Sequence, residues 1–357
     1  MNSGRSTNVM NPASYAAIDS MTFLFDMGLD FTTVKSLENG SRDTRYGGGL
    51  DYITLQFPIT SYMGGSVGLI PYSSVGYSFG TVLDNGTDTR QGSGGLNQLY
   101  FGLGGNPFKG FYLGFNVGYL FGTTVNDIYV RSSVATSLFQ QVFEVRDWHF
   151  QAGVQYKARL NRNNSLTFGL TYTPSKTLLG HARVVKYDVT SKETPDTVGN
   201  VNLRNNYSLS ESWGAGINWE WREQLMVEAD FTYQPWSKAK FLKSDNFIAT
   251  EFSDRWQASL GAQYTPDQRG SFLRRTTYRL GGFFNHDYMK VGDNNVREFG
   301  LSLGFGLPAP SSKTRINVGF EWRQRQAHPT ALLKENYFNV TVGVNFNELW
   351  FFKNKLR

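Results

Sequence analysis

Residues 111–122 read FYLGFNVGYLFG, and this stretch decides the fold class. Its odd-numbered positions are all large and apolar, whereas glycine predominates at its even-numbered positions. A period of two residues indicates a β-strand, because successive side chains of a strand point to opposite faces. The stretch therefore predicts a strand with one bulky apolar face and one nearly bare face.

The same alternation recurs along most of the chain. It is clear in WGAGINWEW (213–221), in FGLSLGFGL (299–307) and in residues 337–346. No segment shows a sustained helical period of 3.6 residues. The pattern predicts about fourteen strands, an even number like that of most bacterial outer-membrane barrels.

The connections between these strands carry a second, independent signal. Polar stretches at 38–47, 83–94 and 190–200 follow odd-numbered strands, whereas even-numbered strands end in short connections at 61–64, 106–110, 161–164 and 222–224. Alternation of long and short connections is typical of a barrel with one rim in a confined periplasm and the other outside the cell.

The bulky face has two interpretations, the core of a soluble sandwich or a surface in contact with lipid. Many of the expected strands exceed ten residues, whereas sandwich strands usually have about five or six. Aromatic residues near strand ends, such as Trp148, Trp219 and Tyr264, are typical of interfacial girdles. We therefore expect an all-β protein, a transmembrane antiparallel β-barrel of about 14 strands.

Composition limits the chemistry that the chain can perform. The 357 residues include no cysteine, which excludes disulfides, thiol catalysis and cysteine-ligated metals. The four histidines lack metal-ligand spacing, and the GGG at 47–49 lacks the lysine of a phosphate-binding loop. The net charge of +6 comes from scattered residues, which does not indicate a nucleic-acid groove. We expect no enzyme activity, catalytic residue, metal, cofactor or nucleic-acid partner.

The N-terminal residues MNSGRSTNVMNPASYAAIDS show no charged region followed by an apolar core, as a signal peptide would. Either the protein is not exported or the sequence is that of the mature chain. The barrel pattern favours the second alternative and an outer membrane of a Gram-negative bacterium.

Several stretches resemble the FadL-type family of long-chain fatty-acid transporters. NPASYAAID (11–19) is similar to the family's plug motif, and GLIPYSSVGYSFG (68–80) is similar to its third strand. SWGAGINWEWREQLMVEADFTYQPWSKAKF (212–241), RWQASLGAQYTPD (255–267) and YRLGGFF (278–284) continue the resemblance. It implies a monomeric fourteen-stranded barrel over 21–347, an N-terminal plug over 1–20 and a lateral opening in the third strand.

The chain departs from the family at both ends. Few residues precede the plug motif, represented by Asn11 and Pro12, and NELWFFKNKLR (347–357) continues past the last strand, so we expect a C-terminal extension over 348–357. In the third strand, Pro71 cannot donate a ladder hydrogen bond. It indicates either a bulge at the rim or a lateral opening formed with Gly68, Tyr72 and Gly76.

Alternation places several candidate ligand-binding residues in the lumen. Arg255, Arg279 and Arg315 either pair with acidic groups of the lumen or receive an anionic head group. The apolar candidates for a ligand tail include Ile70, Leu120 and Phe283.

Three functions remain open on these observations. The first is passive uptake of hydrophobic small molecules such as long-chain fatty acids, through lumenal binding and lateral release into membrane lipid. The second is a structural subunit of an outer-membrane secretion or assembly complex, with other membrane proteins as partners. The third is a general diffusion porin.

Overall fold

The structure is a computed structural model. It describes residues 7–38, 41–83, 86–132, 136–188, 196–204, 208–239, 252–291, 293–309, 314–330 and 333–349. The barrel strands are β1 (Thr22–Glu38), β2 (Ser41–Thr60), β3 (Met63–Leu83), β4 (Gly86–Phe108), β5 (Phe111–Ser132), β6 (Thr136–Arg159), β7 (Asn164–Thr173), β12 (Ser212–Trp221), β13 (Leu225–Gln234), β14 (Arg255–Tyr264), β15 (Thr277–Val291), β16 (Asn294–Pro308), β17 (Arg315–His328) and β18 (Leu333–Leu349).

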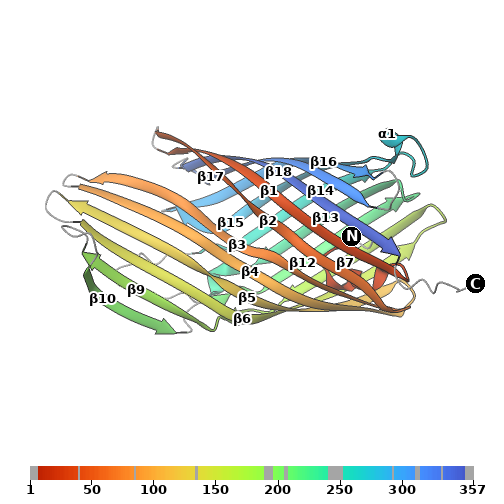
Figure 1. Cartoon of the computed structure of the whole chain (residues 1–357), viewed down its shortest axis with the longest axis horizontal. Coiled ribbons are helices and arrows are strands. Elements are labelled where there is room, and N and C mark those ends of the chain that lie inside the picture. The colour runs from red at the N-terminus through yellow and green to blue at the C-terminus, as the bar shows by residue number, and fades with distance from the viewer. Residues whose placement is uncertain are drawn as a thin grey trace, which may run out of the picture.

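These strands form a closed antiparallel barrel. The sheet contains sixteen strands, and a hairpin of β9 (Gly180–Asp188) and β10 (Asp196–Arg204) lies outside the ring, which leaves fourteen. β1 pairs with β18, and β6 pairs with β7, so the ring has no free edge strand. The expected fourteen-stranded barrel is confirmed (Figure 1).

The two faces of each strand differ as the opening stretch predicts. Phe115 is 45% exposed on the outside of β5, whereas its neighbour Asn116 is 1% exposed on the inside. Bulky apolar side chains cover the outer wall, and most of the buried inward side chains are polar. Such an arrangement suits a barrel whose outer wall contacts lipid and whose interior is polar.

The two ends of the barrel are unlike one another. The connections at 61–62, 109–110, 160–163 and 222–224 lie at the end where β1 begins and β18 ends, which we call the turn end. At the opposite end, the hairpin end, long hairpins extend well beyond the ring (Figure 1). Among the described residues, no helix is long and apolar enough to cross a membrane.

The expectation of long loops after odd-numbered strands was wrong in two places. Residues 38–47 and 83–94 belong to the arms of the hairpins β1–β2 and β3–β4, and only 39–40 and 84–85 separate the strands. Their polar side chains do not prevent pairing, because the ladder satisfies the backbone groups whatever the side chains. Of the third expected loop, 190–200, residues 190–195 lie outside the described residues, and the remainder belongs to β10.

The N-terminal segment enters the ring before the first strand. It forms a short 3₁₀-helix, η1 (Pro12–Ala17), which contacts β2, β3, β4, β5 and β6 from inside the barrel. β18 continues to Leu349, and residues 350–357 of the expected C-terminal extension lie outside the described residues.

Candidate ligand site and lateral gap

The barrel wall is interrupted between β2 and β3. The two strands pair from Thr60 and Met63 at the turn end only as far as Ile53 and Leu69. Residues 41–52 of β2 then pair only with β1, and residues 70–83 of β3 pair only with β4. A strand edge without a partner leaves a row of unpaired backbone groups. We call this interval the lateral gap.

Pro71 lies at the start of the lateral gap. The ladder to β2 ends two residues before it, at Leu69, and proline has no N–H with which to continue. On the side of β4, the register shifts between Pro71 and Ser73, so Tyr72 is the extra residue of a β-bulge. The two interpretations of Pro71, a bulge and an opening, therefore describe the same place in the structure.

The two glycines of this segment lie on different sides of the boundary. Gly68 belongs to the paired part, where an added Cβ would lie 2.5 Å from the carbonyl oxygen of Ile53. Gly68 thus allows β2 and β3 to approach closely just below the lateral gap. Gly76 lies beyond the boundary, and an added Cβ there would have no atom within 4 Å.

A small apolar patch lies inside the barrel beside the bulge. Leu96, Leu120, Val145 and Leu178 pack together, and Leu120 is fully buried. Leu96 is the ladder partner of Ser73, which places this lumen patch directly against the bulge. Since ligand sites are mostly apolar with a few polar groups, the patch offers an apolar ligand a surface within a polar lumen.

The other two apolar candidates lie outside the lumen patch. Ile70 is on the inward face of β3 at the edge of the lateral gap, opposite Gln98 of β4. Phe283 lies on β15, where its ring covers Gly300. The structure therefore brings Leu120 and Ile70 near one another and leaves Phe283 on a different part of the wall.

Tyr72 closes the turn-end side of the lumen patch. Its ring meets the ring of His149 edge-on, with 5.5 Å between the centroids. His149 lies on β6, and its ladder partner on β5 is Gly118, which has no side chain to block this contact. Tyr72 is also within electrostatic reach of Arg255 and Tyr288. The bulge thus turns an aromatic hydroxyl into the lumen at the mouth of the lateral gap.

A second irregularity of the wall supplies Leu178. The turn-end half of β6 pairs with β7, and its hairpin-end half pairs with β9. Between them the chain detours through Pro174 and the short strand β8 (Lys176–Thr177), so residues 146–151 of β6 have a ladder partner only in β5. Lys176 bridges this detour, because its Nζ donates to Oδ1 of the buried Asp147 at 2.6 Å.

The three candidate arginines do not form one site. Arg255 lies in the hairpin-end half, where it donates to the amide oxygens of Gln234, Gln257 and Asn285. His286 of β15 pairs with Trp256, the residue after Arg255 on β14. Arg279 lies seven residues from His286 along β15 toward the turn end, a distance of roughly 23 Å. Arg279 donates to Gln263 and Asn317.

Arg315 belongs with Arg279 at the turn end. It donates to the hydroxyl of Thr277, two residues from Arg279 on β15. Arg255 is accordingly the only one of the three candidates that lies within electrostatic reach of Tyr72 at the lateral gap, as far as the described residues show.

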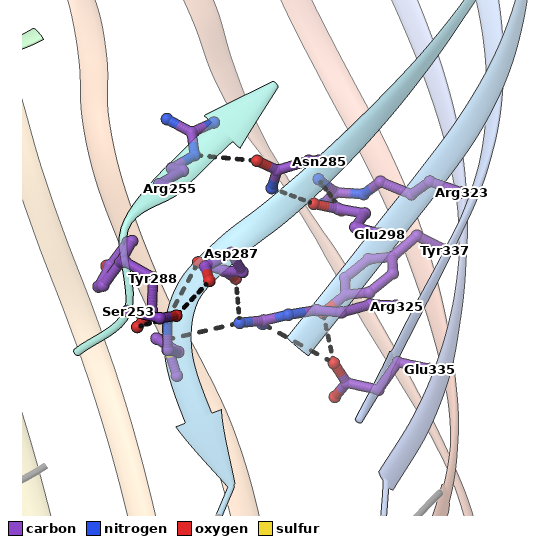
Figure 2. A network of polar contacts seen from close by, with 11 residues as sticks. Ser253, Arg255, Asn285, Asp287, Tyr288, Glu298, Arg323, Arg325, Glu335 and Tyr337 are labelled. Carbon is purple, nitrogen blue, oxygen red and sulfur yellow. Dashed lines mark hydrogen bonds and ion pairs between the residues drawn. The ribbon is translucent and has the colours of Figure 1, made fainter. Parts of the chain in front are cut away.

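Other arginines make the ion pairs with lumenal acids. Arg323 pairs with Glu298 at 3.2 Å, and Glu298 accepts from Asn285, the partner of Arg255. Arg325 pairs with Asp287 at 2.7 Å. Figure 2 shows both chains of contacts along the inner face of β14–β18, which they tie together. Glu298 and Asp287 therefore form ion pairs with Arg323 and Arg325, whereas the hydrogen-bond partners of Arg255 are neutral amides.

The plug occupies a seat made by glycines of β3–β6. Added Cβ atoms would lie 2.0 Å from the plug backbone at Gly64, 2.1 Å at Gly114 and 2.8 Å at Gly104. Any larger residue would displace the plug, so these positions require glycine for space. The glycine-rich inner face of residues 111–122 therefore leaves space for the plug in addition to lining the lumen.

Polar contacts fix the plug in this seat. Asn11 Oδ1 accepts from the N–H of Ala13 at 3.1 Å, which caps η1. Asn11 Nδ2 donates to the carbonyl oxygens of Val154 and Leu170, each at 3.3 Å. Tyr15 is fully buried, and desolvation raises the pKa of its hydroxyl well above the ordinary value. Asn11 and Pro12 thus lie in a docked segment at the turn end.

No group of histidine and acidic side chains in the described part of the chain could hold a metal ion. Alternation in the sequence indicates His149 as a polar residue of the lumen, but it does not indicate Leu178 or Lys176 as part of the site. Pro174 could have indicated the detour, by the reasoning that applies to Pro71.

A family model described as BamG matches residues 2–357. The chain belongs to the BamG family. No curated protein matches the sequence.

Several solved barrels of low sequence identity share the fold of this BamG-family chain. The P. putida toluene transporter TodX has 13% identity and a TM-score of 0.63, over 97% of this chain and 94% of that one. The Ralstonia pickettii toluene transporter TbuX has 12% identity and a TM-score of 0.63, over 94% and 92% of the two chains. A Pseudomonas aeruginosa FadL homologue has 12% identity and a TM-score of 0.63, over 95% and 93%. At such low identity these likenesses show the fold alone.

Proposed function

We propose that this BamG-family barrel lies in the outer membrane of a Gram-negative bacterium and passes hydrophobic small molecules from its lumen into the membrane through the lateral gap. The single observation that carries this proposal is the apolar lumen patch directly against the bulge at Tyr72, where the β2–β3 ladder ends. The solved toluene transporters and the FadL homologue, which share the fold, support a hydrophobic ligand. The role is one of binding and passage, without a reaction.

Different residues bind the apolar part of the ligand and its head group. The apolar part of a ligand contacts Leu96, Leu120, Val145 and Leu178, where burial of apolar surface is favourable. Arg255 donates to an anionic head group such as the carboxylate of a long-chain fatty acid, because its present partners are neutral amides that a carboxylate replaces with a stronger, charge-assisted acceptor. Release then requires movement past Ile70 and Tyr72 to the lateral gap.

A reversible lock of the lateral gap tests the proposal. The pair Tyr52→Cys and Ile70→Cys continues the β2–β3 register by one step beyond Ile53 and Leu69. The native chain has no cysteine, so the new disulfide is the only one. We expect uptake of a labelled long-chain fatty acid by proteoliposomes to fall when the disulfide forms and to return on reduction.

The matched control joins the same two strands below the lateral gap. Leu55 and Val67 are ladder partners on the outer face, so Leu55→Cys with Val67→Cys adds a disulfide where the wall is already closed. Uptake should be the same in the oxidised and reduced control. Uptake that is unaffected by the lock at Tyr52 and Ile70 would refute release through the lateral gap.

The plug supports a second candidate function, that of a structural subunit of an outer-membrane assembly or secretion complex. A plug fixed by glycines and by Asn11 obstructs the lumen on the side of β2–β6, and an obstructed barrel need not transport. Membership of the BamG family is compatible with this role. Stoichiometric membrane-protein partners after mild solubilisation, together with no saturable fatty-acid binding, would favour it over transport.

A further inference from the structure

The outer wall of β15–β18 carries an apolar recess that passage through the lumen does not use. Its volume is about 380 Å³. The outward side chains around it are Leu280, Leu301, Leu303, Phe320, Trp322, Phe338 and Val340. Gly282 lies in the same outward row as Leu301, and the Cδ2 of Leu301 lies 3.2 Å from where a Cβ of Gly282 would be, so a larger residue there would push Leu301 toward the recess. We call this feature the wall recess.

Four basic residues lie above the wall recess on the same outer face, toward the hairpin end. The ladder runs from Arg297 through Gln326 to Lys334, and then through Leu37 to Arg42. Lys35 lies two residues below Leu37 on that face. Because neighbouring strands are about 4.8 Å apart, the cations of Arg297, Lys334 and Arg42 follow one another at intervals of roughly 10 Å. We call these four residues the basic row.

In the part of the chain that the structure describes, no carboxylate lies beside the basic row on the outer face of β16, β17, β18, β1 or β2. The carboxylates of the neighbouring positions, Glu298 and Glu335, point into the lumen and are buried. Within the part of the chain that the structure describes, no carboxylate forms an ion pair with any of the four cations. The outward positions between them carry Gln324, Gln326 and Asn336, whose amides donate hydrogen bonds.

The wall recess and the basic row are continuous. Phe338 borders the wall recess, and the Nζ of Lys35 lies 5.7 Å from the centre of its ring. Trp256 and His286 stand in the same outward row as Arg297 and stack with 6.1 Å between their centroids. Tryptophan is enriched at the level of the lipid head groups, so the basic row lies where lipid phosphates are.

We propose that the wall recess and the basic row together bind an acidic, phosphate-bearing lipid of the membrane leaflet at the hairpin end. Its acyl chain lies in the wall recess, and its phosphate accepts hydrogen bonds from the basic row. Charge complementarity favours this occupant, because an unbalanced row of cations at head-group level attracts anionic lipid. An uncharged lipid would fill the recess equally well and leave the cations without a partner. A zwitterionic lipid would offer its phosphate, but its own ammonium would offset the attraction to the cations, so the net negative charge decides the preference.

Lipid add-back followed by native mass spectrometry tests this site on the full-length chain. The probes are dipalmitoyl phosphatidylglycerol and dipalmitoyl phosphatidylcholine, which have the same acyl chains. We expect the delipidated protein to retain phosphatidylglycerol at least about tenfold more strongly. The triple variant Lys35→Ala, Arg297→Ala, Lys334→Ala should lose that preference, and a bulky side chain from Gly282→Phe should reduce binding of both lipids.

The control variant removes three exposed basic residues from the turn end, with Lys109→Ala, Arg162→Ala and Arg269→Ala, and should keep the preference. Heat-modified migration in electrophoresis verifies that each variant is a folded barrel. Equal retention of the two lipids, an unchanged preference in the first triple variant, or full displacement by inorganic phosphate would overturn the proposal. The proposal would also be overturned if the purified protein carried a stoichiometric protein partner at this face and the first triple variant lost that partner and not a lipid.

Discussion

Replacement of Asn11 by alanine should loosen the plug without disturbing the barrel. The side chain of Asn11 makes three hydrogen bonds, one that caps η1 and two that reach the carbonyl oxygens of β6 and β7. Alanine makes none of them, whereas the strands retain their own ladders. The variant therefore changes the docking equilibrium of the plug specifically.

The structure gives a magnitude for this change. Loss of a helix cap costs about 1 kcal/mol. The two hydrogen bonds to the wall are long, at 3.3 Å, so each contributes about 0.5 kcal/mol, at the low end of the usual range. The sum of about 2 kcal/mol corresponds to a roughly 30-fold larger population of undocked plug, since about 1.4 kcal/mol is a factor of ten.

A cysteine reporter measures this population. Ser14 is 2% exposed in the docked plug, and the native chain has no cysteine. In the background Ser14→Cys, a maleimide reagent reacts only when the plug undocks, so the labelling rate follows the open population. We expect Asn11→Ala to raise the rate about 30-fold, and Asn161→Ala, in an exposed turn, to leave it unchanged. A rate that stays within a factor of two of the parent would refute this account of plug docking.

Three further predictions concern the seat, the lumen and one loop. Gly114→Ala places a Cβ 2.1 Å from the plug backbone, and it should raise labelling of the same reporter, with alanine at open position 105 as the control. Arg325→Leu leaves the buried Asp287 without its cation, which costs about 3 kcal/mol. It should lower the urea midpoint of unfolding, whereas leucine at exposed position 159 should not. Desolvation raises the pKa of Asp254, but hydrogen bonds from Ser237 and Tyr233, with the charge of Lys238, outweigh it and hold that pKa below the ordinary value. The contact is therefore fully stabilising above that ordinary value and lost as pH falls through the lowered one; a fluorophore at position 239, which keeps Lys238, should report release only in that acidic range.

Periodicity predicted the strands, and strand length with the placement of aromatic residues predicted the barrel, because a strand between two different media must alternate over the whole membrane. FYLGFNVGYLFG shows the pattern plainly, since each outward position is bulky and half of the inward ones are glycine. Hairpin length was not predictable in the same way. Polar stretches such as 38–47 pair as strands beyond the apolar band, where neither face has to be apolar and composition no longer distinguishes strand from loop.

The candidate site was predictable where a residue breaks a backbone rule. Pro71 marked the end of a ladder because proline lacks a donor, and the ladder to β2 does end beside it. The partners of Arg255 and Arg279 were not predictable, since the choice between carboxylate and amide depends on cross-strand register. Leu178 enters the lumen only because the chain leaves the wall after Pro174, a detour that no alternation pattern contains.

The joint between β1 and β18 constrains the order in which the protein is built. It pairs the first strand of the ring with the last, from Thr22 opposite Leu349 to Glu38 opposite Leu333, so the circle is completed only after β18 has been made. The plug leads directly into that first strand and rests against β3–β6 inside the circle. In a precursor with β3–β6 already assembled and β1 not yet paired with β18, the N-terminal residues could reach the glycine seat on β3–β6 from the side. Sealing the circle would then trap them, and η1 would be enclosed by strands that are synthesised after it.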